Sequence, residues 1–291
     1  MGEAQTKTWR EIIEISTAYL KNSPSGECAR TDCELLMARL LKCGRGFLQP
    51  FLDKTPSEVH LEAMRRGVKR LKVGEPVQYV LGEWDFRDIT LKIDRRALIP
   101  RPETEELVTR VLKSAQAQVE NPFVIDVCTG SGCIALSLAH EMKRGIFIGI
   151  DISSDAVALA AENAVRLGLE RNVKFAVGDG LDDFDTPQCA DIIVSNPPYI
   201  PSAECDRLDG RVKDWEPRLA LDGGPEGLDF YERFLGDALN LLKPGGAVFF
   251  EIGHNQGAAL KNLMFEFGFD NITVEKDFAG HDRYASAVLR G

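Results

Sequence analysis

From residue 122 onward, short apolar runs alternate with longer segments of helical periodicity, and this alternation strongly constrains the fold. Strands separated by helices need crossover connections, which predict a largely parallel, doubly wound α/β sheet covered by helices on both faces. The expected strands are 123–127, 146–150, 173–177, 190–195, 246–251, about 271–276 and about 284–289. The expected helices lie near 132–143, 155–168, 228–243 and 255–267.

The first part of the chain has a different pattern. Up to about residue 72 the apolar residues recur at helical spacing, which predicts a small bundle of four or five helices. Residues 78–99 alternate as in a short β-hairpin. We therefore expect an N-terminal helical domain at 1–77, a β-hairpin linker at 78–100 and an α/β domain at 101–291.

The charge of the chain is unevenly divided. The net charge is −10, but residues 1–80 hold 13 basic and 10 acidic residues, so they carry about +3 and the remainder about −13. An acidic second part argues against a broad phosphate-contacting surface, and we expect no stable nucleic-acid partner. No apolar run approaches the roughly 20 residues needed to cross a bilayer. The N-terminus resembles neither a signal nor a transit peptide, so we expect a cytoplasmic monomer without membrane contact.

The cysteines and histidines do not form a metal-binding pattern. The seven cysteines are scattered without a Cys-x-x-Cys pair, and the four histidines are isolated. This distribution predicts free thiols in a reducing compartment and no metal site.

A glycine-rich turn follows the first expected strand. It consists of Cys128, Thr129, Gly130, Ser131 and Gly132. Such a turn lets the backbone approach a ligand at the start of the next helix. Asp151, at the end of the second strand, is placed to accept both hydroxyls of a ribose, although it could instead cap a helix. The glycine spacing also fits a nicotinamide-binding fingerprint, but nothing in the chain supplies an acid or base for hydride transfer.

A third polar turn, Gly178-Asp179-Gly180, follows the third strand. In a doubly wound sheet this turn lies beside the same crevice as the glycine-rich turn. The Asp179 carboxylate could accept a hydrogen bond from an exocyclic adenine amine, and a plain turn is the alternative.

The fourth strand runs directly into Asn196, Pro197, Pro198 and Tyr199. The two prolines make a rigid turn and leave the Pro197 carbonyl exposed. A planar NH₂ group can give one hydrogen to the Asn196 side chain and the other to this carbonyl, which aims the nitrogen lone pair out of its plane. Tyr199 can pack on a flat target. The motif predicts methyl transfer to a planar nitrogen, driven mainly by positioning.

The chain resembles the HemK/PrmC family, the release factor glutamine N5-methyltransferases, over essentially its whole length. Beside the turns above, the resemblance rests on Leu98-Ile99-Pro100-Arg101-Pro102-Glu103-Thr104-Glu105, on residues 74–82 and on Phe250-Glu251-Ile252-Gly253. It implies a class I methyltransferase fold with a seven-stranded sheet. The implied reaction moves a methyl group from S-adenosylmethionine to the glutamine of the Gly-Gly-Gln motif in class I peptide chain release factors.

The resemblance also implies roles for individual residues. Residues 128–132 and Asp151 would bind S-adenosylmethionine, with Asp179 or Gly180 at the adenine and Asn196 beside the methyl group. Asn196, Pro197, Pro198 and Tyr199 would hold the glutamine, with Arg101 and Thr104 along the cleft. The helical N-terminal domain would help to grip the release factor.

Two residues depart from related methyltransferases, and two other functions stay open. Cys128 stands where many of these enzymes have glycine, and its small size predicts little effect. Gly180 lacks a bulky residue beside the adenine. An N6-adenine or N2-guanine methyltransferase acting on DNA or RNA is the alternative, because an adenine amine presents the same planar NH₂ group. A non-catalytic module that binds release factors or ribosomes is disfavoured by the intact motifs.

Overall fold

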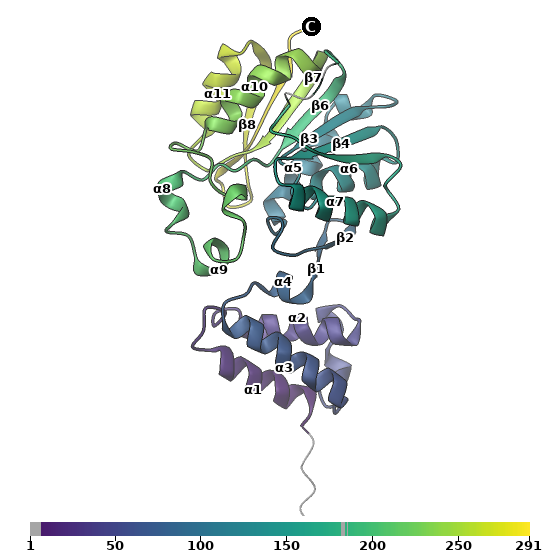
Figure 1. The fold of residues 1–291 in the computed structure, drawn as a ribbon, viewed down its shortest axis with the longest axis vertical. Helices are drawn as coiled ribbons and strands as arrows, with labels where there is room; N and C mark the ends of the chain where they lie inside the picture. The colour runs from purple at the N-terminus through teal and green to yellow at the C-terminus, as the bar shows by residue number, and fades with distance from the viewer. Residues whose placement is uncertain (1–6, 182–183, 185) are drawn as a thin grey trace, which may run out of the picture. The chain divides into compact units, whose positions relative to one another are not determined.

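The computed structural model describes residues 7–181, 184 and 186–291 and divides the chain into two compact units. The first unit is Met1–Glu83 together with Asp209–Trp215, and the second is Trp84–Leu208 together with Glu216–Gly291. Figure 1 labels most of the helices and strands of both units. No helix in the described ranges is both long and apolar enough to span a bilayer.

The first unit is a helical bundle, as expected. Its α-helices are α1 (Trp9–Leu20), α2 (Ala29–Leu41), α3 (Glu58–Lys72), α4 (Val77–Leu81) and the single-turn α9 (Gly210–Lys213), with 3₁₀ turns at Arg45–Phe47 and Gln49–Phe51. The apolar faces of α1, α2 and α3 enclose a core that includes Trp9, Met37 and Leu71. Because α9 lies between β6 and β7 in the chain, this unit also contains a segment from within the sequence that forms the sheet.

The expectation of extended structure at residues 78–82 was wrong. Val77–Leu81 forms α4, and the hairpin is limited to β1 (Glu83–Phe86) and β2 (Ile89–Lys92). Pro76 precedes the first turn of this helix, and Gly82 ends it in the left-handed conformation with φ +75°. Local capping therefore outweighs the strand preference of Tyr79 and Val80.

The second unit contains a seven-stranded sheet of order β5-β4-β3-β6-β7-β9-β8. The strands β5, β4, β3, β6 and β7 pair in parallel, whereas β9 is antiparallel to both of its neighbours. The expected seven-stranded, mostly parallel fold is confirmed. The strand bounds are β3 (Phe123–Val127), β4 (Ile146–Asp151), β5 (Val173–Val177), β6 (Ala190–Ser195), β7 (Leu242–Glu251), β8 (Phe269–Lys276) and β9 (Asp282–Leu289).

Helices cover both faces of this sheet (Figure 1). One layer contains α5 (Pro102–Lys113), α6 (Cys133–Met142) and α7 (Ser154–Leu167); the other contains α10 (Asp229–Leu241) and α11 (Gly257–Glu266). Ile125 and Val127 of β3 pack in the core with Tyr231 and Phe234 of α10. The short helix α8 (Ser202–Cys205) and a 3₁₀ turn at Arg218–Ala220 lie between β6 and α10 in the chain.

The strand order changes direction between β3 and β6. Consecutive strands β3, β4 and β5 extend to one side, whereas β6 and β7 extend to the other. Ligands of open α/β sheets bind at the carboxyl ends of the strands on either side of such a switch. In this chain those ends carry the glycine-rich turn and the Asn-Pro-Pro-Tyr segment.

Candidate active site

The glycine-rich turn adopts the backbone that glycine favours. Gly130 and Gly132 have φ +56° and +82°, and Cys128 has φ +60°. A Cβ atom on Gly132 would lie 2.9 Å from the Phe175 ring, so the helix start packs closely against β5. The positive φ of Cys128 costs an L-residue about 1 kcal/mol. The expectation that Cys128 has little effect considered only its size and not this backbone cost.

The buried carboxyl group of Asp126, which was not among the predicted site residues, supports this turn through hydrogen bonds. Asp126 of β3 is fully buried, and its Oδ2 accepts hydrogen bonds from the Thr129 hydroxyl at 2.6 Å and from the Ala135 amide at 3.2 Å. Burial raises the pKa of Asp126 to about 7, although both hydrogen bonds oppose the rise. Asp126 thus ties the turn to the first turn of α6. The one sign of this role in the sequence is that Asp126 is a charged residue within an otherwise apolar strand.

Asp151 lies at the end of β4 and faces the glycine-rich turn. Its Oδ2 accepts from the Gly130 amide at 2.9 Å and its Oδ1 from the Ser153 amide at 3.0 Å. A carboxylate oxygen has two acceptor sites, so each oxygen keeps capacity for a ligand hydroxyl. Burial raises the pKa of Asp151, and the two amides oppose the rise. The cap of α7 is Ser153 rather than Asp151, because the Ser153 hydroxyl accepts from the Ala156 amide.

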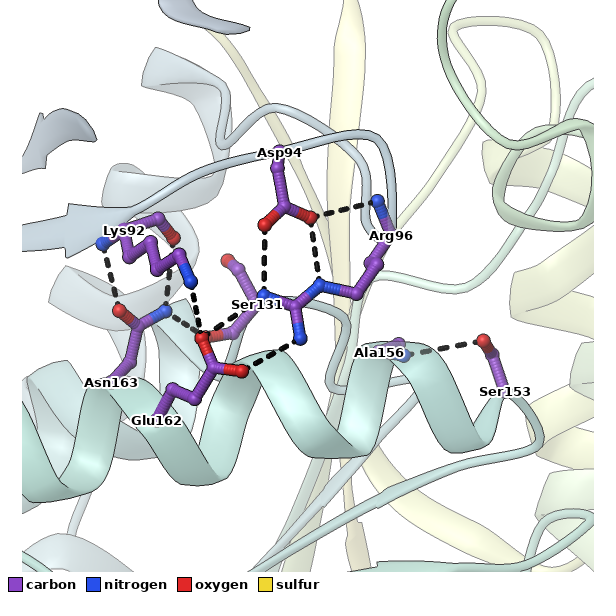
Figure 2. A network of polar contacts seen from close by, with 8 residues as sticks. All are labelled: Lys92, Asp94, Arg96, Ser131, Ser153, Ala156, Glu162 and Asn163. Carbon is purple, nitrogen blue, oxygen red and sulfur yellow. Dashed lines mark hydrogen bonds and ion pairs between the residues drawn. The ribbon is translucent and has the colours of Figure 1, made fainter. Parts of the chain in front are cut away.

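The segment that begins at Lys92, the last residue of β2, is held to α7 beside this turn (Figure 2). Asn163 accepts from the Lys92 amide at 2.7 Å and donates to the carbonyls of Lys92 and Ser131 at 3.1 and 3.0 Å. One buried amide therefore joins this segment to the glycine-rich turn.

Charged groups reinforce that attachment. The Arg96 guanidinium pairs with Asp94 and Glu162, each at 2.8 Å, and Lys92 pairs with Glu162 at 2.6 Å (Figure 2). The hydrogen bonds from Arg96 and Lys92 hold the pKa of Glu162 low, at about 2. The network fixes the chain that leads to Ala97 and Leu98, which line the cavity described below.

Asn196 joins a chain of hydrogen bonds that begins at a buried glutamate. Its Nδ2 donates to the Thr104 hydroxyl at 3.0 Å, and that hydroxyl donates to Glu251 Oε2 at 2.7 Å. The Tyr199 hydroxyl donates to Glu251 Oε1 at 3.2 Å and accepts from Arg283 at 3.2 Å. Burial raises the pKa of Glu251, against the opposing hydrogen bond from Thr104 and the charge of Arg283.

Arg101 is held by another buried carboxylate. Its guanidinium donates to Glu216 Oε1 at 2.5 Å, while Glu216 Oε2 accepts from the Ile99 amide at 3.0 Å. Glu216 therefore joins the segment after Tyr199 to the start of α5.

One cavity, with about 900 Å³ of empty space including its open mouth, brings most of the predicted residues together. Its wall includes the predicted residues Thr104, Cys128, Thr129, Gly130, Ser131, Asp151, Asp179, Gly180, Asn196 and Pro198. It also includes residues that were not predicted, among them Ala97, Leu98, Ile152 and Phe230.

Four predicted residues lie outside the lining of this cavity: Arg101, Gly132, Pro197 and Tyr199. Asp179 is on the wall, but its carboxylate already pairs with Arg233 at 2.6 Å. Pro197 is buried, and no hydrogen bond from the described residues reaches its carbonyl oxygen. That oxygen keeps its acceptor capacity.

Two family models match the chain. One, described as a methyltransferase domain, covers residues 119–264, and the other, the PrmC N-terminal domain, covers residues 11–82. Together they account for the helical unit and most of the sheet.

Curated relatives match almost the whole chain. A release factor glutamine methyltransferase from Bacillus subtilis is 38% identical and the match covers 97% of this chain and 98% of that protein. Proteins of the same name from Moorella thermoacetica and Rhodopirellula baltica are 39% and 34% identical, with 91% and 96% of this chain covered and 93% and 95% of those proteins.

Solved structures share the fold at low sequence identity. The hMettl16 catalytic domain in complex with MAT2A 3'UTR hairpin 6 superposes with a TM-score of 0.58 at 17% identity, over 78% of this chain and 82% of that chain. A methyltransferase from Pyrococcus furiosus superposes with a TM-score of 0.51 at 17% identity, over 69% and 88% of the two chains.

Proposed function

Because this chain belongs to the release factor glutamine methyltransferase family, we propose that it methylates a glutamine side chain of class I peptide chain release factors with S-adenosylmethionine as donor. The acceptor is the amide nitrogen, N5, of the glutamine in the Gly-Gly-Gln motif. The observation that carries the proposal is the position of Asn196. This side chain lies at the carboxyl end of β6, on the wall of the same cavity as the glycine-rich turn and Asp151.

The residues on the cavity wall fit S-adenosylmethionine. The positive φ angles of the glycine-rich turn leave room for a ligand against the backbone at residues 128–132. Asp151 has free acceptor capacity on both oxygens for the ribose hydroxyls. Gly178–Gly180 would border the adenine, where the pairing of Asp179 with Arg233 favours a contact through the backbone. When bound, this cofactor supplies an electrophilic sulfonium methyl group.

The Asn-Pro-Pro-Tyr segment offers two acceptors for a planar NH₂ group: Asn196, which lines the cavity, and the carbonyl of Pro197, the next residue, which does not. Asn196 Nδ2 is occupied by Thr104, so Oδ1 is left for one amide hydrogen. The free carbonyl of Pro197 is left for the other, and the two prolines hold it rigidly. We propose that Pro198 forms the wall beside the amide, that the ring of Tyr199 supports the turn, and that Arg101 orients the neighbouring substrate backbone.

These contacts act on the nucleophile. An amide nitrogen is a poor nucleophile because its lone pair is delocalised, so holding its NH₂ plane in a fixed position supplies much of the acceleration. The acceptors at Asn196 and Pro197 also polarise the two N–H bonds of the amide, which increases the electron density on its nitrogen. Methyl transfer would form a carbon–nitrogen bond as the carbon–sulfur bond of the donor breaks, and the nitrogen would then lose one proton to solvent.

The proposal is tested with labelled S-adenosylmethionine and three acceptors: a release factor, its Gln→Ala variant at the Gly-Gly-Gln motif, and duplex DNA. Label is expected on the intact release factor alone. Label on DNA, or equal label on the Gln→Ala variant, would refute the assignment.

The role of Asn196 is tested by Asn196→Ala. Transfer should fall about 100-fold or more, since the amide loses one of its two fixed contacts, while the dissociation constant of S-adenosylmethionine stays within about threefold. Asp151→Asn is the comparison variant, because its main effect should be a higher dissociation constant for S-adenosylmethionine. Full activity in Asn196→Ala would contradict the proposed contact.

A further inference from the structure

A buried carboxylate stands behind the Asn196 side chain. Glu251, the last residue of β7, is 1% exposed, and its Oε2 accepts a hydrogen bond from the Thr104 hydroxyl. Thr104, on α5, is itself 2% exposed and accepts from Asn196 Nδ2. Three groups from three different elements thus form one hydrogen-bonded line that ends at the cavity wall.

The direction of this line is set by counting hydrogens. A threonine hydroxyl has one hydrogen, and an ionised carboxylate can only accept. The Thr104 hydrogen therefore goes to Glu251, which leaves the hydroxyl oxygen able to accept alone. The Asn196 NH₂ group therefore faces the Thr104 hydroxyl oxygen and donates to it. If Asn196 Oδ1 faced that oxygen instead, two acceptors would meet with no hydrogen between them.

We propose that Glu251 is a positioning residue for methyl transfer, which acts through Thr104 to hold Asn196 with its Oδ1 toward the substrate amide. The inference rests on the proposed function, since it concerns the acceptor that holds the glutamine NH₂ group. A reversed Asn196 would present a donor to another donor, and the substrate amide would lose the contact that orients it.

The second oxygen of Glu251 is also engaged. Its Oε1 accepts from the Tyr199 hydroxyl, and Arg283 of β9 donates to that hydroxyl and to the Ile252 carbonyl at 3.1 Å. The same carboxylate therefore fixes the first and last residues of the Asn-Pro-Pro-Tyr segment. Tyr199 in turn cannot rotate without breaking two hydrogen bonds.

The ionisation of Glu251 decides the direction of the line. Burial raises its pKa, and a proton on Oε2 would let Glu251 donate to Thr104, whose hydrogen would then turn to Asn196. The titratable and charged groups that act on this site come from several elements: Glu103, Cys133, Tyr199, Tyr231, Arg283 and Tyr284. The wild-type turnover rate should consequently fall toward low pH.

Variants of Thr104 test the line directly. Thr104→Ser keeps the hydroxyl and should keep kcat within about threefold, whereas Thr104→Val should lower kcat about 30-fold or more with little change in the affinity for S-adenosylmethionine. The matched control is Thr109→Val on the same helix, whose hydroxyl contacts Arg87 and the Glu105 carbonyl. Full kcat in Thr104→Val, an equal loss in Thr104→Ser, or an equal loss in Thr109→Val would overturn the proposal.

Glu251→Gln tests the direction of the line without removing a side chain. A glutamine can satisfy every partner by donating to Thr104 and accepting from Tyr199, which reverses Asn196. We expect kcat to fall about 10-fold or more and to lose its decline at low pH, while Thr104→Ser retains that decline. A wild-type pH profile in Glu251→Gln would overturn the proposal. Failure of the proposed function is a separate result, because the wild-type protein would then leave the release factor unlabelled.

Discussion

Replacement of Asp126 by asparagine should flatten the pH dependence of the stability of the methyltransferase unit. Asp126 is fully buried in β3, and this burial raises its pKa to about 7 from the ordinary value of 3.8. The hydrogen bonds from Thr129 and Ala135 offset only part of the rise. Asparagine at this position keeps an oxygen that can accept both hydrogen bonds but cannot ionise.

The sign follows from the direction of the pKa change. A raised pKa means that the folded state holds the proton more tightly than the unfolded state, so this group favours folding most at low pH. The advantage is lost as pH rises from the unfolded pKa through the folded pKa. The two pKa values differ by an amount that corresponds to roughly 4 kcal/mol in total, of which about 2–3 kcal/mol falls between about pH 5 and about pH 8.

Urea-dependent hydrogen exchange on peptides that cover β3 measures the free energy of unfolding of this unit alone. The free energy of Asp126→Asn relative to wild type should rise by roughly 2–3 kcal/mol between about pH 5 and about pH 8, without cofactor. The new NH₂ group takes the place of Asp126 Oδ1, which has no partner among the described residues. It costs about 1–2 kcal/mol at every pH, so the change with pH is the readout.

An exposed substitution provides the comparison. Asp155→Asn, in the first turn of α7, replaces an exposed aspartate in the same unit and reports the effect of the exchange at the surface. Parallel curves for wild type and Asp126→Asn would refute the reasoning, since they would mean that Asp126 has the same affinity for a proton in the folded and unfolded states.

Two further substitutions test the packing around the cavity. Gly149→Ala would place a Cβ atom 2.5 Å from the Phe175 ring, so we expect the free energy of unfolding to fall by about 1–3 kcal/mol. Calorimetry should also show weaker binding of S-adenosylmethionine. An unchanged dissociation constant would contradict the close packing of β4 and β5. Glu216→Gln removes the charge that holds Arg101 and should lower the free energy of unfolding by about 2 kcal/mol in urea titrations. The exposed ion-pair partner Asp206, changed to asparagine, should cost no more than about 0.5 kcal/mol, and an equal cost at both sites would argue against a structural role for Glu216.

The sheet could be predicted from the sequence because its signals are local. Each parallel strand is a short apolar run, and β6 is buried along its whole length, so the pattern needed no tertiary information. The early start of β7 at Leu242 was missed because Pro244, Gly245 and Gly246 resemble a turn. α4 was missed for a similar reason, since strand-forming residues at its centre concealed the capping by its flanks.

The site was predictable in part. The glycine-rich turn, Asp151 and Asn196 follow strands directly, so their meeting at one sheet edge follows from the topology. Glu251 also ends a predicted strand at this edge, but its action on Thr104 was not predicted, and Glu216 follows no strand. Glu216 acts on Ile99, 117 residues away, and Glu251 acts on Thr104, 147 residues away. Nothing local reveals the partner of such a carboxylate until the fold brings the two residues together.

The register of the sheet explains why Glu251 is available at Asn196. Ser195 pairs with Phe250 in the parallel β6–β7 ladder. The residues that follow them, Asn196 and Glu251, therefore leave the two neighbouring strands at the same level. In the antiparallel β7–β9 ladder Glu251 pairs with Tyr284, which brings Arg283 toward the same strand end. A shift of one residue in the β6–β7 ladder would turn the carboxylate to the opposite face of the sheet from Asn196. A shift in the β7–β9 ladder would instead move Arg283 away from it. The geometry of Asn196 therefore depends on the pairing of three strands as well as on the two prolines that follow it.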